Sequence, residues 1–131
     1  MSGTTLVRRI IGVILLVVIG VIHLLVMKTG FHLQTYLGIL FLLDAVGALV
    51  GAIWIALADT STAWLLGGLV ALAPLVGYIV TRTTALPGLH VLPWTTPTGL
   101  PLGPISLIVE ALMVIVTLLT LMQPSKRLKA A

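Results

Sequence analysis

Four apolar stretches, each long enough to cross a lipid bilayer, constrain this chain more than any other feature of its sequence. An α-helix rises about 1.5 Å per residue, so roughly 20 apolar residues span the ~30 Å hydrocarbon core of a membrane. The stretches are residues 10–27, 36–57, 63–80 and 105–122. They predict an all-α membrane protein: a four-transmembrane-helix antiparallel bundle in which residues 1–131 form a single membrane domain.

The composition excludes a water-soluble domain. Hydrophobic residues make up 60% of the 131 residues and charged residues 8%, and the mean hydropathy is +1.27. Seven Lys and Arg with three Asp and Glu are too few to form the polar surface of a soluble protein of this size. The net charge of +4 is therefore interpreted as a topology signal, the lipid bilayer is the expected partner, and no nucleic-acid partner is expected. The absence of cysteine excludes disulfides and thiol chemistry.

The basic residues predict how the chain is oriented. Five of them lie outside the first and last spans, and two lie at the opposite ends of the spans. The five are Arg8, Arg9, Lys126, Arg127 and Lys129, and the two are Lys28 and Arg82. Because cytoplasmic segments carry the excess of Lys and Arg, both termini are expected in the cytoplasm. The connection Asp59–Thr62 is then a tight cytoplasmic turn, with Trp64 as an interfacial anchor.

The longest connection, the outer loop at residues 83–104, is rich in proline and glycine. These residues are Pro87, Pro93, Pro97, Pro101 and Pro104 with Gly88, Gly99 and Gly103. Proline lacks a backbone donor and restricts the residue before it, so the loop is expected to consist of turns and extended chain. Trp94 and the surrounding leucines favour a cap on the outer interface, and a stiff linker is the alternative.

Polar side chains within or next to the four spans are expected at one depth. Counted along each helix, all lie within about 12 Å of its outer end. They are His23, Asp44, Tyr78, Arg82 and Glu110. The inner half of the bundle is expected to hold no ionisable group. Because a charged side chain in hydrocarbon costs at least a few kcal/mol, Asp44 and Glu110 should be paired, neutral or hydrated, with His23 and Arg82 as the available partners.

Two interpretations of these five residues remain open. The favoured one is a buried polar network that fixes helix pairing in a non-enzymatic accessory or interaction subunit, within a larger membrane complex or a homo-oligomer. The alternative is an outward-facing ligand, metal or proton-coupled transport site built on His23, Asp44 and Glu110. His32 and His90 in the outer loops are the further candidate metal ligands. No metal-binding or nucleophile motif is present, so neither a cofactor nor an enzymatic activity is favoured.

Four short motifs cover most of the chain. They are I-H-L near the end of the first span, Y-x-G-x-L-F-L-L opening the second, G-Y-x-x-T-R-T-x-x-L-P-G closing the third and S-L-x-x-E in the fourth. In these motifs the chain resembles a group of uncharacterised small four-span integral membrane proteins of high-GC, actinobacterial-type bacteria. The resemblance implies a multi-pass protein of the bacterial cytoplasmic (inner) membrane. It marks as motif positions His23, Tyr36, Tyr78, Arg82, Pro87, Gly88 and Glu110.

Overall fold

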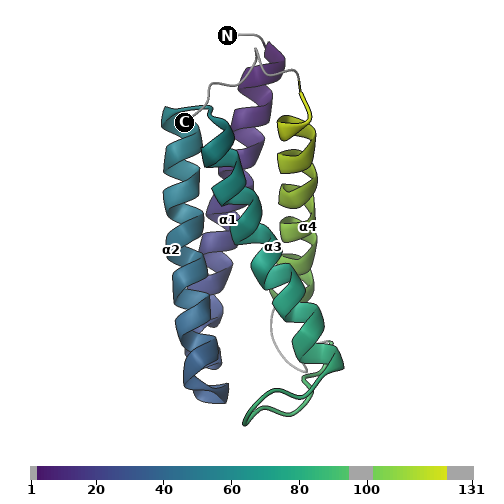
Figure 1. The fold of residues 1–131 in the computed structure, drawn as a ribbon. Coiled ribbons are helices and arrows are strands. Elements are labelled where there is room, and N and C mark those ends of the chain that lie inside the picture. The colour runs from purple at the N-terminus through teal and green to yellow at the C-terminus, as the bar shows by residue number, and fades with distance from the viewer. Residues whose placement is uncertain (1–2, 95–101, 124–131) are drawn as a thin grey trace.

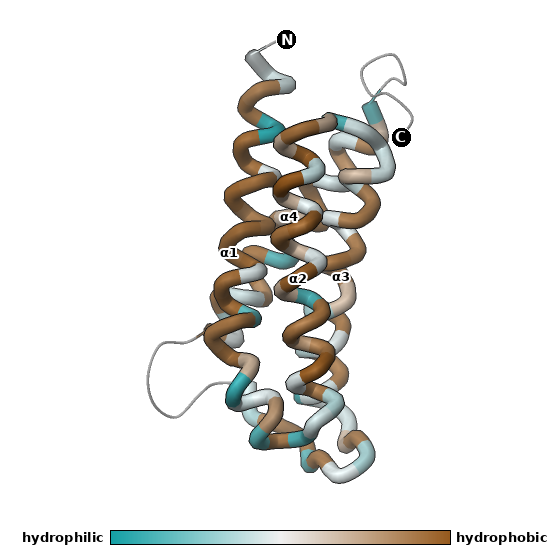
Figure 2. The backbone as a smooth tube through the Cα atoms, turned by 90° about the vertical axis from the view of Figure 1, so that its left-hand side faces the viewer, coloured by the Kyte–Doolittle hydropathy of each residue, from teal (hydrophilic) through white to brown (hydrophobic). Residues whose placement is uncertain are grey.

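The computed structural model describes residues 3–94 and 102–123 as an antiparallel bundle of four helices (Figure 1). The helices are α1 (Gly3–Leu33), α2 (Thr35–Leu57), α3 (Ser61–Thr83) and α4 (Leu102–Leu121). All four are long and apolar enough to cross a membrane, which indicates a multi-pass membrane protein. Apolar residues follow the helices along most of their length (Figure 2). The prediction of an all-α bundle is confirmed for the described part of the chain.

The bundle has two distinct ends. At the terminal end, α1 begins at Gly3 and α4 ends at Leu121, and the turn between α2 and α3 lies beside them (Figure 1). At the loop end, α1 meets α2 and the chain leaves α3 towards α4. These two names are used below because they describe the molecule without assigning either end to a side of a membrane.

Helix α1 is longer than the apolar stretch that predicts it. It begins before Arg8, so this residue lies inside the helix, and it continues to Leu33. Only Gln34 separates α1 from α2, in place of the longer connection implied by the apolar stretches. The corner is tight because Gly38 lies against the Phe31 ring, where a Cβ atom would overlap the ring. Helix α1 therefore folds back directly onto α2.

The turn from α2 to α3 is short, as its sequence predicts. Thr60 caps α3, since its side-chain oxygen accepts a hydrogen bond of 3.2 Å from the Ala63 amide. Trp64, expected at the membrane interface, is instead fully buried. A Cβ atom at Gly12 of α1 would lie 2.5 Å from the Trp64 ring, so the indole occupies the space that a side chain there would need.

A layer of apolar side chains crosses the middle of the bundle. Leu16 of α1, Ile55 of α2 and Met113 of α4 are each fully buried and converge on Gly67 of α3. A Cβ atom at Gly67 would lie between 3.0 and 3.4 Å from all three side chains. Because Gly67 has no side chain, the four helices pack closely at this level, and the three side chains are called the apolar layer below.

The described part of the loop, residues 84–94, bends back onto the loop end. Leu86 and Leu89 exchange backbone hydrogen bonds of 3.0 and 2.9 Å around a turn in which Gly88 has a φ of 68°. Tyr36 at the start of α2 donates a hydrogen bond of 2.8 Å to the Pro87 carbonyl, and Gln34 donates one of 2.5 Å to the Gly88 carbonyl. These bonds tie the segment to α2. The remainder of the predicted cap, residues 95–101, lies outside the described residues.

Candidate functional site

Three ionisable side chains from three helices meet inside the bundle. His23 of α1 lies between Asp44 of α2 and Glu110 of α4. Its Nδ1 atom is 3.3 Å from Asp44 Oδ2, and its Nε2 atom is 3.8 Å from Glu110 Oε2. The imidazole thus presents one ring nitrogen to each carboxyl group. These three residues are called the His–Asp–Glu cluster below.

Close contact between α1 and α2 brings the cluster together. A Cβ atom at Gly20, one turn from His23, would lie 3.4 Å from the Ala45 carbonyl oxygen, so the two backbones approach closely beside Asp44. The side chains are enclosed to different degrees: Asp44 is 11% exposed, His23 is 5% exposed and Glu110 is 1% exposed. The Phe41 ring packs edge-on against the imidazole, with ring centroids 5.6 Å apart. The cluster therefore lies in an apolar setting and is least enclosed at Asp44.

Hydrogen bonds define the state of two cluster members. His23 Nδ1 is 2.8 Å from the Ile19 carbonyl oxygen, which can only accept, so we assign a proton to Nδ1. In the neutral ring, Nε2 then carries a lone pair and faces Glu110. The Ser106 hydroxyl, one turn earlier on α4, donates a hydrogen bond of 2.6 Å to Glu110 Oε2. Glu110 Oε2 thus accepts a hydrogen bond from Ser106 and lies 3.8 Å from the imidazole, beyond hydrogen-bond distance.

Each carboxyl group of the cluster has one buried oxygen that makes no hydrogen bond. Within the described residues these are Asp44 Oδ2, whose contact with His23 Nδ1 at 3.3 Å is an ion-pair distance without hydrogen-bond geometry, and Glu110 Oε1. Nearly all buried polar atoms in folded proteins are hydrogen-bonded, and a buried unpaired oxygen is costly. The cluster is thus a polar network with free acceptor capacity, which distinguishes it from a network whose members are all satisfied.

Tyr78 and Arg82 lie in a second group, next to the loop. The Arg82 guanidinium stacks 3.7 Å from the centroid of the Tyr78 ring and donates a hydrogen bond of 3.2 Å to the Pro93 carbonyl. Tyr78 donates one of 2.7 Å to the Trp94 carbonyl. Among the described residues, the ion pairs of the His–Asp–Glu cluster do not include Arg82. The five residues grouped by depth therefore divide into a buried cluster and a pair that holds the loop against α3.

The other two histidines stay apart from the cluster. His32 lies in the last turn of α1 and His90 lies in the loop, and both are exposed. In the described part of the chain, no group of three or more His, Asp or Glu side chains has an arrangement that could hold a metal ion. The structure thus provides no geometric support for a metal site made from His23, Asp44, Glu110, His32 and His90.

A second charged group, at the terminal end, was not expected from the sequence. Arg8 is buried and forms an ion pair with Asp59. The other carboxylate oxygen of Asp59 accepts a hydrogen bond of 2.6 Å from the Trp64 indole, and Arg8 donates one of 2.8 Å to Gln123. Arg8 and Asp59 both lie outside the apolar stretches of the sequence, and their buried contact with each other is a finding of the structure. An acidic residue in a short turn before a tryptophan was the only sequence signal that pointed to such a contact.

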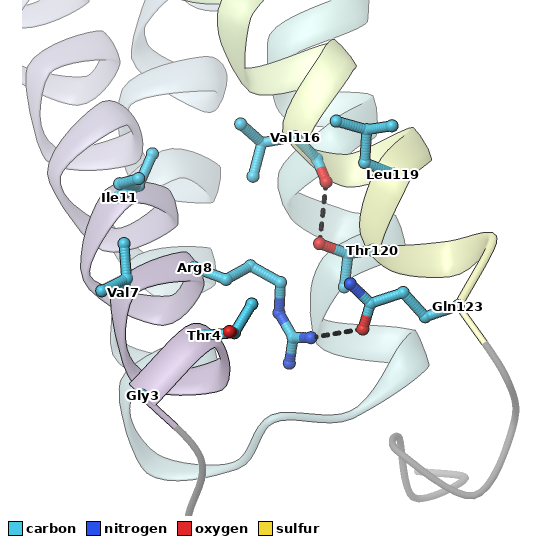
Figure 3. A pocket seen from close by; sticks show the side chains of 9 residues that line it. All are labelled: Gly3, Thr4, Val7, Arg8, Ile11, Val116, Leu119, Thr120 and Gln123. Carbon is cyan, nitrogen blue, oxygen red and sulfur yellow. Dashed lines mark hydrogen bonds between the residues drawn. The ribbon is translucent and has the colours of Figure 1, made fainter.

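An open groove of about 570 Å³ lies between α1 and α4 beside this ion pair (Figure 3). The Arg8 side chain extends across it towards Gln123, and the Thr120 hydroxyl is occupied by a hydrogen bond of 2.7 Å to the Val116 carbonyl (Figure 3). Its lining residues are Gly3, Thr4, Val7, Arg8, Ile11, Val116, Leu119, Thr120 and Gln123. Most of this lining is apolar, and the charge of Arg8 is already balanced by Asp59.

Of the His–Asp–Glu cluster and the Arg8–Asp59 ion pair, the one with free acceptor capacity is the stronger candidate for a functional site. The charges of Arg8 and Asp59 balance each other, and the atom of this pair that lacks a hydrogen bond, Arg8 Nε, is a donor and not an acceptor. The His–Asp–Glu cluster holds two acidic groups against one imidazole and has buried oxygens that make no hydrogen bond. No protein-family model, no curated protein and no solved structure matches this chain, so the function is argued from these residues.

Proposed function

We propose that this protein is a small membrane subunit or interaction partner whose His–Asp–Glu cluster binds and releases protons. The observation that carries the proposal is the arrangement of one imidazole between two carboxyl groups, within 3.8 Å of each, with one buried oxygen on each carboxyl group that makes no hydrogen bond. A network that served only to fix helix pairing would be expected to satisfy its buried oxygens. Intramembrane ionisable residues commonly mark proton relays and ion pathways.

The charges of the cluster favour a proton as its ligand. With both carboxyl groups ionised and His23 protonated, the cluster would carry a net charge of −1. One further proton brings that charge to zero, which lowers the cost of enclosing the cluster in a low-dielectric bundle. A proton also needs no more space than the cluster already provides.

The same side chains argue against a hydrolase. Ser106 is the hydroxyl nearest to the cluster, and it donates to Glu110. A serine nucleophile would need its hydroxyl bonded to a histidine that accepts the proton. Ser106 is also buried, so a substrate would have no direct access to it. A non-enzymatic role within a larger membrane complex or a homo-oligomer therefore remains the proposal for the chain as a whole.

We also propose that both termini lie in the cytoplasm of a bacterial cell. The support is the excess of basic residues outside the first and last apolar stretches, five against two at the opposite ends. In this orientation the loop end faces outward, and the His–Asp–Glu cluster lies in the outer half of the membrane. The site would then respond to the pH outside the cytoplasmic membrane.

Infrared difference spectroscopy tests the proton-binding proposal. The purified protein in lipid nanodiscs is titrated between about pH 5 and pH 9, which brackets the usual range of histidine titration. We expect carboxyl bands that change with pH and that disappear in Asp44→Asn and Glu110→Gln. Tyr78→Phe serves as the control, because Tyr78 lies outside the cluster, and it should keep both bands. Cluster bands that stay constant with pH, together with a lower melting temperature in every cluster variant, would support the purely structural interpretation instead.

A further inference from the structure

The His–Asp–Glu cluster is arranged as an ordered route, and this inference rests on the proposed proton-binding function. We propose that protons enter and leave at Asp44 from the loop end, pass through the His23 imidazole, and are stored on Glu110. The apolar layer formed by Leu16, Ile55 and Met113 would close the route towards the terminal end. The cluster would then be a proton site with one open side.

The order of the three residues follows from their exposure and from the ring geometry. Exposure falls from 11% at Asp44 through 5% at His23 to 1% at Glu110. The two carboxyl groups face opposite ring nitrogens, so the imidazole lies between them. Helix α3 contributes no ionisable side chain to this cluster within the described structure, because Arg82 is engaged by the Pro93 carbonyl and the Tyr78 ring. His23 is consequently the connection between the exposed and the enclosed carboxyl group.

Release of a stored proton fits the hydrogen-bonding state of His23. Nδ1 carries a proton and Nε2 carries a lone pair that faces Glu110. When a small movement closes the 3.8 Å between Nε2 and Glu110 Oε2 to hydrogen-bond distance, a protonated Glu110 gives its proton to Nε2, which makes the ring an imidazolium and leaves Glu110 as a carboxylate. The Nδ1 proton then turns from the Ile19 carbonyl to Asp44 Oδ2, 3.3 Å from Nδ1, and is lost from the Asp44 carboxyl group to water. One proton has moved outward, and the ring is left neutral with its proton on Nε2.

Uptake is the reverse sequence and starts from that second state of the ring. A protonated Asp44 gives its proton to Nδ1, and the imidazolium passes the Nε2 proton to the Glu110 carboxylate. The ring returns to the form with a proton on Nδ1, in which the Ile19 carbonyl accepts its hydrogen bond. Uptake and release therefore alternate between two forms of the ring, and each transfer needs a small movement that brings a ring nitrogen into hydrogen-bond geometry with Asp44 or Glu110.

The packing of α2 on α3 indicates why the His–Asp–Glu cluster is most exposed at Asp44. A Cβ atom at Gly47 of α2 would lie 3.0 Å from Val70 of α3, so the two helices touch at this level. Asp44 lies one turn beyond Gly47 towards the loop end. Towards the loop end α3 leans away from α2 (Figure 1). Asp44, on the loop side of the Gly47 contact, is the most exposed member of the cluster, at 11%.

The apolar layer lies between the His–Asp–Glu cluster and the terminal end of the bundle. Met113 is one turn from Glu110 along α4, and Leu16 is two turns from His23 along α1, both towards the terminal end. Both side chains are fully buried and meet at Gly67 of α3. A proton moving beyond Glu110 would need a chain of hydrogen-bonding groups through this layer, and the side chains that form it are hydrocarbon or thioether.

Time-resolved infrared spectroscopy after a pH jump tests the order of transfer. The full chain is studied in nanodiscs, with Asp44→Asn and Glu110→Gln used to assign the two carboxyl bands. In His23→Gln we expect the Glu110 response to slow by about 100-fold or more, because a positioned proton carrier typically contributes that much, while the Asp44 response keeps its wild-type rate. A Glu110 response that stays fast in His23→Gln would overturn the route.

Ser106→Ala is the matched control for that experiment. Ser106 contacts Glu110 from the loop side, so it is the other conceivable carrier. We expect the Glu110 response to slow less in Ser106→Ala than in His23→Gln, because Ser106 bonds Glu110 but does not connect it to Asp44. Slowing in Ser106→Ala in place of His23→Gln would assign the route to the hydroxyl and overturn the role of His23. If neither carboxyl band of the wild type responds to pH, the proposed function itself fails, which is a different result.

A sidedness measurement uses the wild type and is independent of how the variants fold. The protein is reconstituted into vesicles, and the fraction in each orientation is determined by protease cleavage at the termini. A pH step applied only on the side of the loop end should change the cluster bands within the response time seen in nanodiscs. An equal and equally fast response to a step on the terminal side would show that the apolar layer is no barrier and would overturn the proposal.

Discussion

Arg8 and Asp59 lie 51 residues apart in the sequence and form an ion pair that joins α1 to the turn between α2 and α3. Each partner also bonds a further segment. The Trp64 indole of α3 donates a hydrogen bond to Asp59, and Gln123, which follows α4, accepts one from Arg8. The Arg8 guanidinium lies 5.7 Å from the Trp64 ring centroid. One ion pair therefore connects segments from all four helices at the terminal end.

Removing one partner of this ion pair should destabilise the bundle. Asp59→Asn leaves the buried Arg8 charge without its counter-ion, and we expect the free energy of unfolding to fall by about 3–5 kcal/mol, as for other buried ion pairs. The double variant Arg8→Met with Asp59→Asn should be more stable than Asp59→Asn alone, because no unpaired charge remains. Thermal unfolding in mild detergent, followed by circular dichroism, measures both. Lys28→Met, an exposed change on the same helix, should leave the midpoint unchanged.

A second pair of variants separates the charge of Glu110 from its packing. Glu110→Gln keeps an oxygen that can accept from Ser106, so its melting temperature should stay close to that of the wild type. Glu110→Ala leaves Ser106 without its acceptor and opens a cavity, which should cost about 2–5 kcal/mol. The same thermal measurement applies. Equal losses in both variants would mean that the negative charge of Glu110 itself stabilises the fold.

The fold was largely predictable because hydropathy and helix length fix it. Four apolar stretches predicted four helices, and the regular rise of a helix placed His23, Asp44 and Glu110 at one depth. Their meeting in the structure follows from that depth and from small residues between α1 and α2. The depth of a residue in the middle of a span can be predicted by counting residues along the helix, because the regular helical backbone fixes its position along the axis.

The remaining features depend on tertiary packing at the helix ends. Arg8 and Asp59 lie outside the apolar stretches, where a charged residue is usually solvated, and only the packing of the turn on α1 reveals their contact. Trp64 resembled an interfacial anchor, yet the missing side chain at Gly12 provides it with a buried position. Arg82 donates a hydrogen bond to the Pro93 carbonyl of the loop, and the sequence does not predict the path of that loop.

Glycine substitutions test the packing of α1 on α3. A Cβ atom at Gly12 would lie 2.5 Å from the fully buried Trp64 ring, so Gly12→Ala should destabilise the bundle by about 1–3 kcal/mol through overpacking. Gly77→Ala is the matched control, because a Cβ atom there has no atom within 4 Å. That control should be neutral or raise stability by up to about 1 kcal/mol, since alanine favours helix. If Gly12→Ala were as stable as the wild type, the Trp64 indole would not lie against Gly12.

The loop segment should detach when its turn is changed. Gly88 has a φ of 68°, and a Cβ atom there would lie 2.5 Å from the Gln34 amide nitrogen. Gly88→Ala therefore strains the turn and removes the hydrogen bond from Gln34. In the wild type the Leu92 amide donates a hydrogen bond of 2.8 Å to the Thr81 carbonyl. We expect faster hydrogen exchange at this amide in Gly88→Ala. Gly3→Ala, at a position with open space, is the control and should leave the exchange rate unchanged.

Cysteine labelling decides which end of the bundle faces the cytoplasm. The chain has no cysteine, so His90→Cys and Ser125→Cys each introduce a single reactive site, one in the loop and one after α4. A membrane-impermeant maleimide added to intact bacterial cells should label His90→Cys and spare Ser125→Cys if the termini lie inside, as proposed from the distribution of basic residues. Both sites should react after the cells are lysed, which controls for accessibility. Labelling of Ser125→Cys alone in intact cells would reverse the proposed orientation, and Asp44 would then exchange protons with the cytoplasm.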